Sequence, residues 1–495
     1  MGQPGPAHDQ PGADHALTWR CGLAPGVSLR RAGGRAYVVG ERPLAVVQVR
    51  PAALRLLARL RGRREVVLPA PRPAELRLLR HLDAAGLVSL RPEPGPAGEL
   101  GVTIVVPVRD RPRELAECLA ALDALRYPRR LLDVVVVDDG SARPVAVPEG
   151  VRLVRLRRSA GAAAARNAGA RVARSDVLAF VDSDCVAEPD WLDRLLPELA
   201  DPEVAAVGGR IGARSERSWL ERYEAVRSPL DLGPARAAAA PGRPVSYLVT
   251  ANLAVRRADF EAAGGFDERL RWGEDVDLCW RLHAAGRRLV YQPAGMVRHR
   301  HRGGVRAFAA TRASYAGSEA ALQARHPENQ RWLGFSAGGA AVALGALGAL
   351  LGKRRLLVAG ALALAVETAV VAGRLAPLGV PRRRAVPALL RGQATGLYWA
   401  ARQLTRYYGL ALAVAALSWR PARGRLSLGL AAMWAAPAIA DWRRLRPRQS
   451  MPAFVAAHVL DDTAYQFGLL HGCWRARTLL PLRVRLRLMG GRAPS

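Results

Sequence analysis

The chain has 495 residues, half of them hydrophobic and 23% charged, a composition that excludes an intrinsically disordered protein and allows about three domains. Its formal charge of +32 comes almost entirely from arginine, since Lys353 is the only lysine, and the abundance of Ala, Gly and Pro indicates that much of this excess is compositional. The five cysteines are scattered without a CxxC pair, which argues against a disulfide framework or a zinc site.

Residues 1–21 are rich in Pro, Gly and Asp, so we expect a disordered leader there. The leader carries no apolar run of the kind found in secretory signals, and we therefore expect the catalytic part to stay in the cytoplasm. A small domain is expected over residues 22–90, in the order strand, strand, helix, helix, strand. Its expected elements lie at residues 35–40, 44–49, 51–60, 74–86 and 88–90. This order is the outline of a winged-helix-like α+β module.

Residues 91–100 are rich in Pro and Gly and are expected to form a linker. The domain that follows, residues 101–330, begins with alternating apolar strands and helices. They are expected at residues 101–108, 111–125, 131–139 and 177–184. This alternation predicts an α/β domain with a mostly parallel sheet.

Residues 331–495 form a hydrophobic region that we expect to be helical and membrane-associated. The run 332–352 is uncharged, and a second apolar run, 356–373, follows it but contains Glu367. Both runs are dominated by Ala and Gly, so a membrane-spanning pair, an interfacial hairpin and a buried soluble hairpin all remain open. The tail, residues 479–491, alternates Arg with apolar residues, which suits a membrane surface.

Three pairs of acidic residues lie at strand ends or in loops of the central domain. The pairs are Asp138 and Asp139, Asp182 and Asp184, and Glu274 and Asp275. In an open α/β sheet ligands bind beyond the carboxyl ends of the strands, so the first two pairs are expected to converge on one site. Two carboxylates crowded at a strand end repel each other unless a cation or hydrogen-bond donors lie between them.

A nucleoside diphosphate sugar is a substrate that needs such an arrangement. Its leaving diphosphate gains negative charge, which a divalent ion held by carboxylates stabilises. Hard oxygen ligands favour Mg²⁺ or Mn²⁺ over zinc. A uridine-type nucleoside is expected at the acids of the first strand end. Asp275, on a separate loop, could take the proton of the acceptor hydroxyl from the opposite side of the sugar, which would invert the anomeric centre.

Six segments of the central domain resemble the motifs of family 2 glycosyltransferases, which adopt the GT-A fold. In chain order they are VTIVVPVRDR, VVVDDGS, AAAARNAGA, FVDSD, TANLAVRRADFEAAGGFDERLRWGEDVDLCWRL and VRHRHR. The resemblance implies a nucleotide-sugar site made of Pro107, Asp138, Asp139, Arg166, Asn167 and Asp182. It implies a metal site made of Asp182, Asp184 and His299, although a surface histidine in an Arg-rich loop is an alternative for His299. It implies catalysis by Asp275 as the base, beside Glu274.

The outer segments resemble a narrower family, the glycosyltransferases of the mycofactocin system. The resemblance rests on GVSLRRAGGRAYVVG, SPLDLG, RHPENQ and DDTAYQFGLLHGCWRARTLLPL. It implies transfer of glucose from UDP-glucose to a peptide-derived redox cofactor, building a β-linked glucose chain at the cytoplasmic side of the cell membrane. A membrane glycosyltransferase for a lipid-linked or cell-wall glycan is the alternative, and a scaffold with a degenerate transferase fold is a third.

The small domain over residues 22–90 resembles the peptide-recognition domains of ribosomal-peptide maturation. It could therefore bind a precursor peptide or a maturation protein, or serve a purely structural role. No basic recognition helix stands out above the general Arg background, so we expect no nucleic-acid partner.

Overall fold

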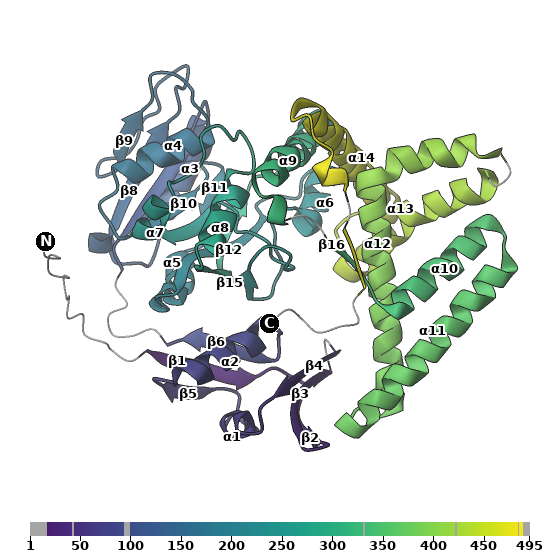
Figure 1. Ribbon diagram of the computed structural model, residues 1–495. Helices are drawn as coiled ribbons and strands as arrows, with labels where there is room; N and C mark the ends of the chain where they lie inside the picture. The colour runs from purple at the N-terminus through teal and green to yellow at the C-terminus, as the bar shows by residue number, and fades with distance from the viewer. Residues whose placement is uncertain are drawn as a thin grey trace, which may run out of the picture. The chain divides into compact units, whose positions relative to one another are not determined.

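The computed structural model describes residues 17–41, 44–93, 100–329, 332–420, 423–483 and 485–488. The chain divides into two compact units, Met1–Gly98 and Glu99–Ser495 (Figure 1). Most of the expected leader lies outside the described residues, but strand β1 (Thr18–Leu23) begins before the expected boundary at residue 22. Residues 94–99 of the expected linker also lie outside the description.

The first unit contains two antiparallel sheets of three strands, in the orders β5-β1-β6 and β2-β3-β4. Its further elements are β2 (Val27–Ala32), β3 (Arg35–Glu41), β4 (Leu44–Val49), α1 (Ala53–Ala58), β5 (Val66–Pro69), α2 (Pro73–Ala84) and β6 (Val88–Pro92). All five expected elements are present, but β5 separates the two helices, so the expected order of helix directly after helix is wrong. Because β5 is only four residues long, it gives little periodic signal and exists through its pairing with β1. The winged-helix-like interpretation stays a prediction.

The second unit is built on a nine-stranded sheet. The strand order is β11-β15-β12-β14-β10-β7-β8-β9, and β13 pairs with β15. The strands are β7 (Val102–Val108), β8 (Leu132–Asp138), β9 (Arg152–Arg155), β10 (Val177–Val181), β11 (Cys185–Ala187), β12 (Val204–Ala213), β13 (Ala237–Ala239), β14 (Asn252–Arg256) and β15 (Arg288–His299). The half from β10 to β9 is parallel, whereas β14 runs antiparallel to both of its neighbours. The sheet is therefore mixed and not mostly parallel as expected.

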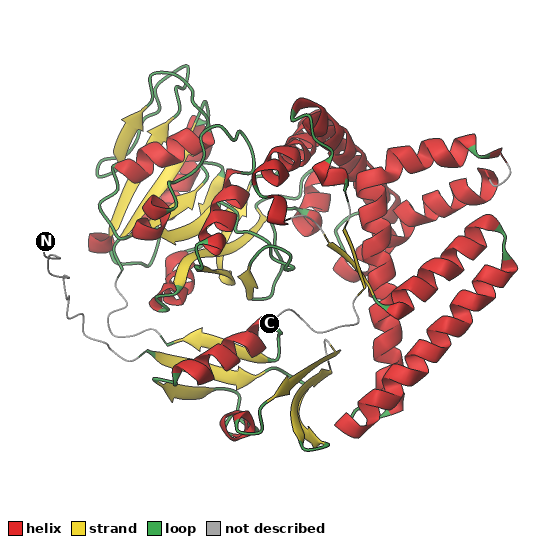
Figure 2. Ribbon diagram, viewed as in Figure 1, coloured by secondary structure: helices red, strands yellow, loops and turns green. Residues whose placement is uncertain are grey.

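Helices cover both faces of this sheet (Figure 2). They are α3 (Pro112–Asp123), α4 (Ala162–Arg171), α5 (Trp191–Leu195), α6 (Trp219–Arg227), α7 (Arg257–Ala262) and α8 (Glu274–Ala284). Residues of α3 and α5 pack in one apolar core, and residues of α4, α7 and α8 pack in another. The small side chains of α4 allow a close approach to the sheet: a Cβ atom at Gly169 would lie 2.4 Å from Val105 Cγ1.

Long helices form the remainder of the second unit. They are α9 (Val305–Arg325), α10 (Ala337–Leu351), α11 (Arg354–Leu375), α12 (Arg382–Ser418), α13 (Arg423–Leu445) and α14 (Met451–Arg475). Helices α9 and α14 meet backbone to backbone, because a Cβ atom at Gly468 would lie 2.0 Å from the Ala313 carbonyl oxygen. This contact joins the last long helix directly to the domain that carries the sheet.

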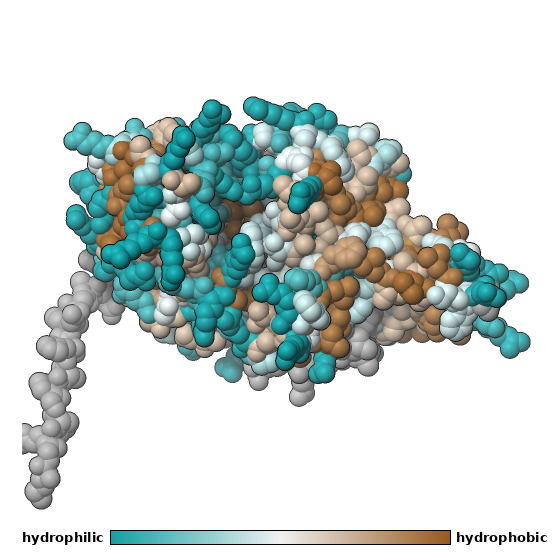
Figure 3. Space-filling model, turned by 90° about the horizontal axis from the view of Figure 1, so that it is seen from above, coloured by the Kyte–Doolittle hydropathy of each residue, from teal (hydrophilic) through white to brown (hydrophobic). Residues whose placement is uncertain are grey.

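The hydrophobic runs form helices of unequal length. The run 332–352 is divided into a short strand, β16 (Trp332–Phe335), and α10, and β16 pairs in parallel with β17 (Arg485–Leu488). Part of the alternating tail is thus a strand, as its period of two residues permits. Among the described residues, one helix, Arg354–Leu378, has the length and composition to cross a membrane, with a mean hydropathy of 2.1. Figure 3 shows hydrophobic residues gathered at the surface over these helices.

Candidate active site

The parallel strands β8, β7 and β10 lie side by side, so their carboxyl ends share one edge of the sheet. Asp138 is the last residue of β8, and Asp182 directly follows β10. A cavity of about 1540 Å³ lies beyond this edge, and its wall includes Asp182, Glu274 and Asp275. The structure therefore brings Asp182 of the second acidic pair and both residues of the third pair to one cavity.

A buried arginine holds the acidic residues of this cavity together. Arg166, on α4, donates from Nη1 to Glu274 Oε1 at 2.6 Å and from Nη2 to Asp182 Oδ1 at 2.7 Å. Burial alone would lower the pKa of Arg166, but the charges of Asp182 and Glu274 outweigh it and raise that pKa. One guanidinium thus connects a strand end to the beginning of α8, and its charge offsets two carboxylates that would otherwise repel each other.

Asp275 lies in the first turn of α8, where the backbone orients its carboxylate. Gly273 precedes the helix with φ of 82°, a left-handed conformation that favours glycine. Val276 N–H donates to Asp275 Oδ1 at 2.9 Å. Burial, followed by the negative charge of Glu274, raises the pKa of Asp275 to about 7. A carboxylate with a pKa near neutrality, in the wall of a cavity, has the properties of a general base.

Asp184 and His299 meet through strand pairing. Strand β11 pairs antiparallel with β15, which places Cys185 opposite His299. As a result, His299 Nε2 lies 3.5 Å from Asp184 Oδ1. Arg111, at the start of α3, forms an ion pair with Asp184. Asp184 and His299 are close enough to share a cation, and a carboxylate with an imidazole is a donor set suited to Mn²⁺ or Mg²⁺.

The three residues expected to bind a metal do not gather as one cluster. Within the described parts of the chain, no group of three or more His, Cys, Asp or Glu residues is arranged to hold a metal ion. Asp182 instead receives the hydrogen bond from Arg166, while Asp184 and His299 form a pair of their own. Asp184 and His299 thus lie next to each other, whereas Asp182 is engaged by Arg166.

The first acidic pair shapes loops near the strand end. Asp138 is buried, and its Oδ1 accepts a hydrogen bond from Ser141 N–H at 2.8 Å. Asp139 accepts from Ala160 N–H at 2.7 Å and from the Ser159 hydroxyl at 2.8 Å. Asp138 therefore holds the loop after β8, and Asp139 holds the loop before α4. Pro107, also expected at the nucleotide site, lies in β7 opposite Val137 of β8.

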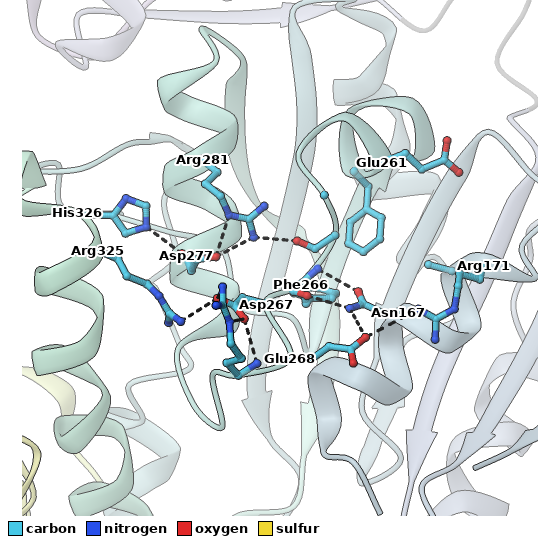
Figure 4. A pocket seen from close by; sticks show the side chains of 15 residues that line it. Asn167, Arg171, Glu261, Phe266, Asp267, Glu268, Asp277, Arg281, Arg325 and His326 are labelled. Carbon is cyan, nitrogen blue, oxygen red and sulfur yellow. Dashed lines mark hydrogen bonds and ion pairs between the residues drawn. The ribbon is translucent and has the colours of Figure 1, made fainter. Parts of the chain in front are cut away.

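Asn167 faces a different pocket (Figure 4). Its Nδ2 donates to the Phe266 carbonyl at 2.8 Å, and its Oδ1 accepts from Phe266 N–H at 2.9 Å. Nδ2 also donates to Glu268 Oε1 at 3.0 Å. Asn167 therefore fixes the loop around Phe266, and the structure does not bring it to the cavity that Asp275 lines.

A buried network of charges attaches the helical region to the catalytic domain. Arg312 on α9 donates to Glu224 Oε1 at 2.9 Å and to Asp461 Oδ1 at 3.0 Å, and Tyr223 donates to Asp461 Oδ2 at 3.0 Å. Asp461, the first acidic residue of the DDTAYQFG segment, is therefore a member of this network. Sequence patterns did not indicate it, because its members are far apart along the chain.

Sequence reasoning also missed several residues of the site. Arg111, which pairs with Asp184, belongs to the motif at the end of the first strand, and its position after that strand was an available signal. Tyr247, Tyr315 and Arg406 line the cavity. They come from a loop and two helices that no local pattern links to the acidic pairs.

Comparisons with known proteins identify a family model and several relatives that match this chain. The family model described as "Glycosyl transferase family 2" matches residues 103–264. Two proteins of Mycobacterium tuberculosis, from strains CDC 1551 / Oshkosh and ATCC 25618 / H37Rv, are each named "Pre-mycofactocin glycosyltransferase". Each is 35% identical to this chain over 485 residues, which cover 93% of this chain and 96% of the relative.

A solved structure, "Mannosyltransferase PcManGT from Pyrobaculum calidifontis in complex with GDP-Man and Mn2+", is 21% identical, with a TM-score of 0.42. The likeness covers 75% of this chain and 89% of that one.

The matched region and the strand-end acids define the class of protein, which is a family 2 glycosyltransferase with a GT-A α/β domain. Because the similarity to the Mycobacterium proteins extends over nearly the whole length of both chains, the protein belongs to the family of the pre-mycofactocin glycosyltransferases.

The buried bridge made by Arg166 generates a prediction about stability. Replacing Arg166 with Met leaves the carboxylates of Asp182 and Glu274 without their common partner. We expect the free energy of unfolding to fall by about 3–5 kcal/mol, the usual cost of removing one partner of a buried ion pair. Urea denaturation followed by tryptophan fluorescence measures this change.

Arg171→Met, on the same helix but exposed, is the matched control and should change the stability by about 0.5 kcal/mol or less. The double variant Arg166→Met with Glu274→Gln should recover part of the loss, since it removes one unpaired charge. Equal stabilities of the Arg166 and Arg171 variants would contradict the bridge.

Proposed function

We propose that the protein is an inverting hexosyltransferase that transfers glucose from UDP-glucose to the peptide-derived redox cofactor mycofactocin, or its precursor, and builds a β-linked oligosaccharide. The observation that carries the proposal is the position of Asp275, a carboxyl group with a pKa of about 7, in the same cavity as Asp182. The acceptor is inferred from the name of the M. tuberculosis relatives, which extend over 93% of this chain.

The proposed reaction is a single displacement. Asp275 removes the proton from an acceptor hydroxyl, the hydroxyl oxygen forms a bond to the anomeric carbon, and the bond from that carbon to the diphosphate breaks. Because the oxygen enters on the side opposite the leaving diphosphate, the anomeric configuration inverts. Asp275 ends protonated, and the electron pair of the broken bond stays on the diphosphate.

The donor end of the site is assigned to the strand ends on the side of Arg111. Asp184 and His299 would hold Mg²⁺ or Mn²⁺, which when bound offsets the charge that develops on the leaving diphosphate. Arg111, paired with Asp184, places a further positive charge beside that position. Asp138 and Asp139 hold the loops at the nucleoside end, and Asp182 is kept in place by Arg166.

We also propose that the enzyme attaches to the cytoplasmic side of the cell membrane through its helical region. The support is the apolar helix Arg354–Leu378 and the exposure of large apolar side chains on other helices. Leu428 is 73% exposed and Trp474 is 76% exposed. Such surfaces are typical of membrane or partner contacts. The first unit is proposed to bind a precursor peptide or a maturation protein.

The assignment of Asp275 gives a prediction for catalysis and its pH dependence. Asp275→Asn keeps the shape of the side chain but removes the proton acceptor, so transfer should fall by about two to four orders of magnitude. In the unmodified enzyme the base must be deprotonated. The transfer rate should therefore fall about tenfold for each pH unit below about 7. Initial rates of nucleotide release across pH 5–9 measure both effects.

Glu274→Gln is the comparison variant for this test, since Glu274 holds Arg166 and is not assigned to proton transfer. A larger loss of transfer in Glu274→Gln than in Asp275→Asn, at equal folded fraction, would move the catalytic role to Glu274.

The proposed metal site gives a second prediction. Asp184→Asn removes the carboxylate charge that would bind the ion, so metal-dependent transfer should fall by about two orders of magnitude or more. Electron paramagnetic resonance of added Mn²⁺ should show weaker binding in the same variant. Asp190→Asn, in the following loop, is the control and should bind Mn²⁺ as the unmodified enzyme does. Full activity in excess chelator would reject a metal-assisted reaction.

Membrane attachment is tested by fractionating gently lysed cells. We expect the protein in the membrane fraction. Sodium carbonate or high salt should release a protein that lies at the interface but should not release one that spans the bilayer. Recovery of the protein in the soluble fraction alone would contradict both modes.

A further inference from the structure

The cavity that contains Asp275 extends from the catalytic domain to the C-terminal helices. Its apolar wall is formed by residues of α10, α12 and α13, namely Ala343, Ala346, Leu347, Leu350, Leu397, Leu404 and Met433. Asp182, Glu274 and Asp275 line the same cavity. One cavity thus contains both the proposed catalytic base and a wall of aliphatic side chains from the long helices.

Arg406 of α12 and Glu319 of α9 are the charged side chains that the described long helices present to this cavity, and Glu319 accepts a hydrogen bond from the Tyr407 hydroxyl at 2.9 Å. The structure gives Arg406 no hydrogen bond or ion pair with a described residue, whereas its neighbour on α12, Arg402, contacts His458 at 2.9 Å. The guanidinium carbon lies 3.7 Å from the ring centroid of Tyr465, so the ring fixes one face of the group. Burial lowers the pKa of Arg406, although the negative charges of Asp461, Asp462 and Glu319 oppose this shift from a distance.

A guanidinium whose N–H groups lack a hydrogen-bonded acceptor among the described residues can bind an oxygen acceptor of a ligand in the cavity. The ligand that fits would place an apolar body among the aliphatic side chains and an oxygen acceptor at Arg406, with its reacting hydroxyl at Asp275. The donor diphosphate does not need this position, because Arg111, Asp184 and His299 are assigned to it.

We propose that the C-terminal helices form the acceptor-binding half of the active site, and that Arg406 binds a carboxylate or carbonyl oxygen of an acceptor with a compact apolar body. The inference rests on the proposed transferase function and specifies its acceptor by chemical class. A compact body is favoured over a lipid chain because α11, the helix with the length and composition to cross a membrane, contributes no described residue to the cavity wall.

The experiment measures binding directly, so that it does not depend on turnover. Three compounds share one apolar body and differ in their polar end: 4-phenylbutanoate, 4-phenylbutanamide and 4-phenylbutan-1-ol. Their affinities for the full-length protein are measured by isothermal titration calorimetry. We expect the carboxylate, the amide or both to bind about tenfold more tightly than the alcohol, since a hydrogen bond to a charged group contributes on that scale.

Variants test the origin of this preference. Arg406→Gln should abolish it, and Arg406→Lys should retain it for the carboxylate, since the charge remains. Ala346→Phe, which fills the cavity, should weaken the binding of all three compounds. Arg391→Gln is the matched control, because Arg391 is exposed on the same helix and does not line the cavity. A preference for the carboxylate alone would identify an anionic acceptor, and an equal preference for the amide would identify a carbonyl group.

Several results would overturn the proposal. One is a preference that survives in Arg406→Gln. Another is weaker UDP binding in that variant with unchanged binding of the three compounds, which would assign Arg406 to the donor. Tighter binding of dodecan-1-ol than of the phenyl compounds, independent of Arg406, would indicate a lipid acceptor. Slow hydrolysis of UDP-glucose is measured in parallel to separate the proposed transferase function from the proposed role of Arg406. If hydrolysis is absent, the donor assignment is rejected, and the binding experiment alone decides the role of Arg406.

Discussion

The active site depends on one buried charge, the guanidinium of Arg166, between the carboxylates of Asp182 and Glu274. These two residues lie at the end of a strand and at the start of a helix, and both face the same cavity. Without a cation between them, their desolvated charges would repel each other. Arg166 thus sets the position of α8 relative to the sheet, and α8 in turn carries Asp275.

The catalytic domain provides only part of the site. Residues of α9 and of α10, α12, α13 and α14 line the rest of the cavity. Their attachment rests on the buried network of Arg312, Glu224 and Asp461 and on the close contact of α9 with α14 at Gly468. The helical region therefore encloses part of the cavity, in addition to its proposed contact with the membrane.

Local patterns predicted the chemistry better than the geometry. Apolar strands that end in acids identified the strand ends and the acidic pairs, because alternation and strand length are properties of short segments. Patterns of this kind did not indicate β5, because it is too short to show a period. They also did not indicate that β14 runs antiparallel, because the direction of a strand does not change its residue pattern. The family resemblance assigned Asn167 to the nucleotide site, which stays a prediction; in the structure its amide holds the Phe266 loop.

The sequence by itself determined the family, the α/β catalytic domain and the identity of the acidic residues, since each depends on residue types at short spacing. Only the tertiary structure decided which acids meet. The β11–β15 register brings His299 to Asp184, and the packing of α4 brings Arg166 to Glu274. The cavity around Arg406 is likewise tertiary, because its wall forms where α12 packs against α13 and α14. Long-range contacts of this kind leave no local periodicity, so the residues that complete the site could be found only in the folded chain.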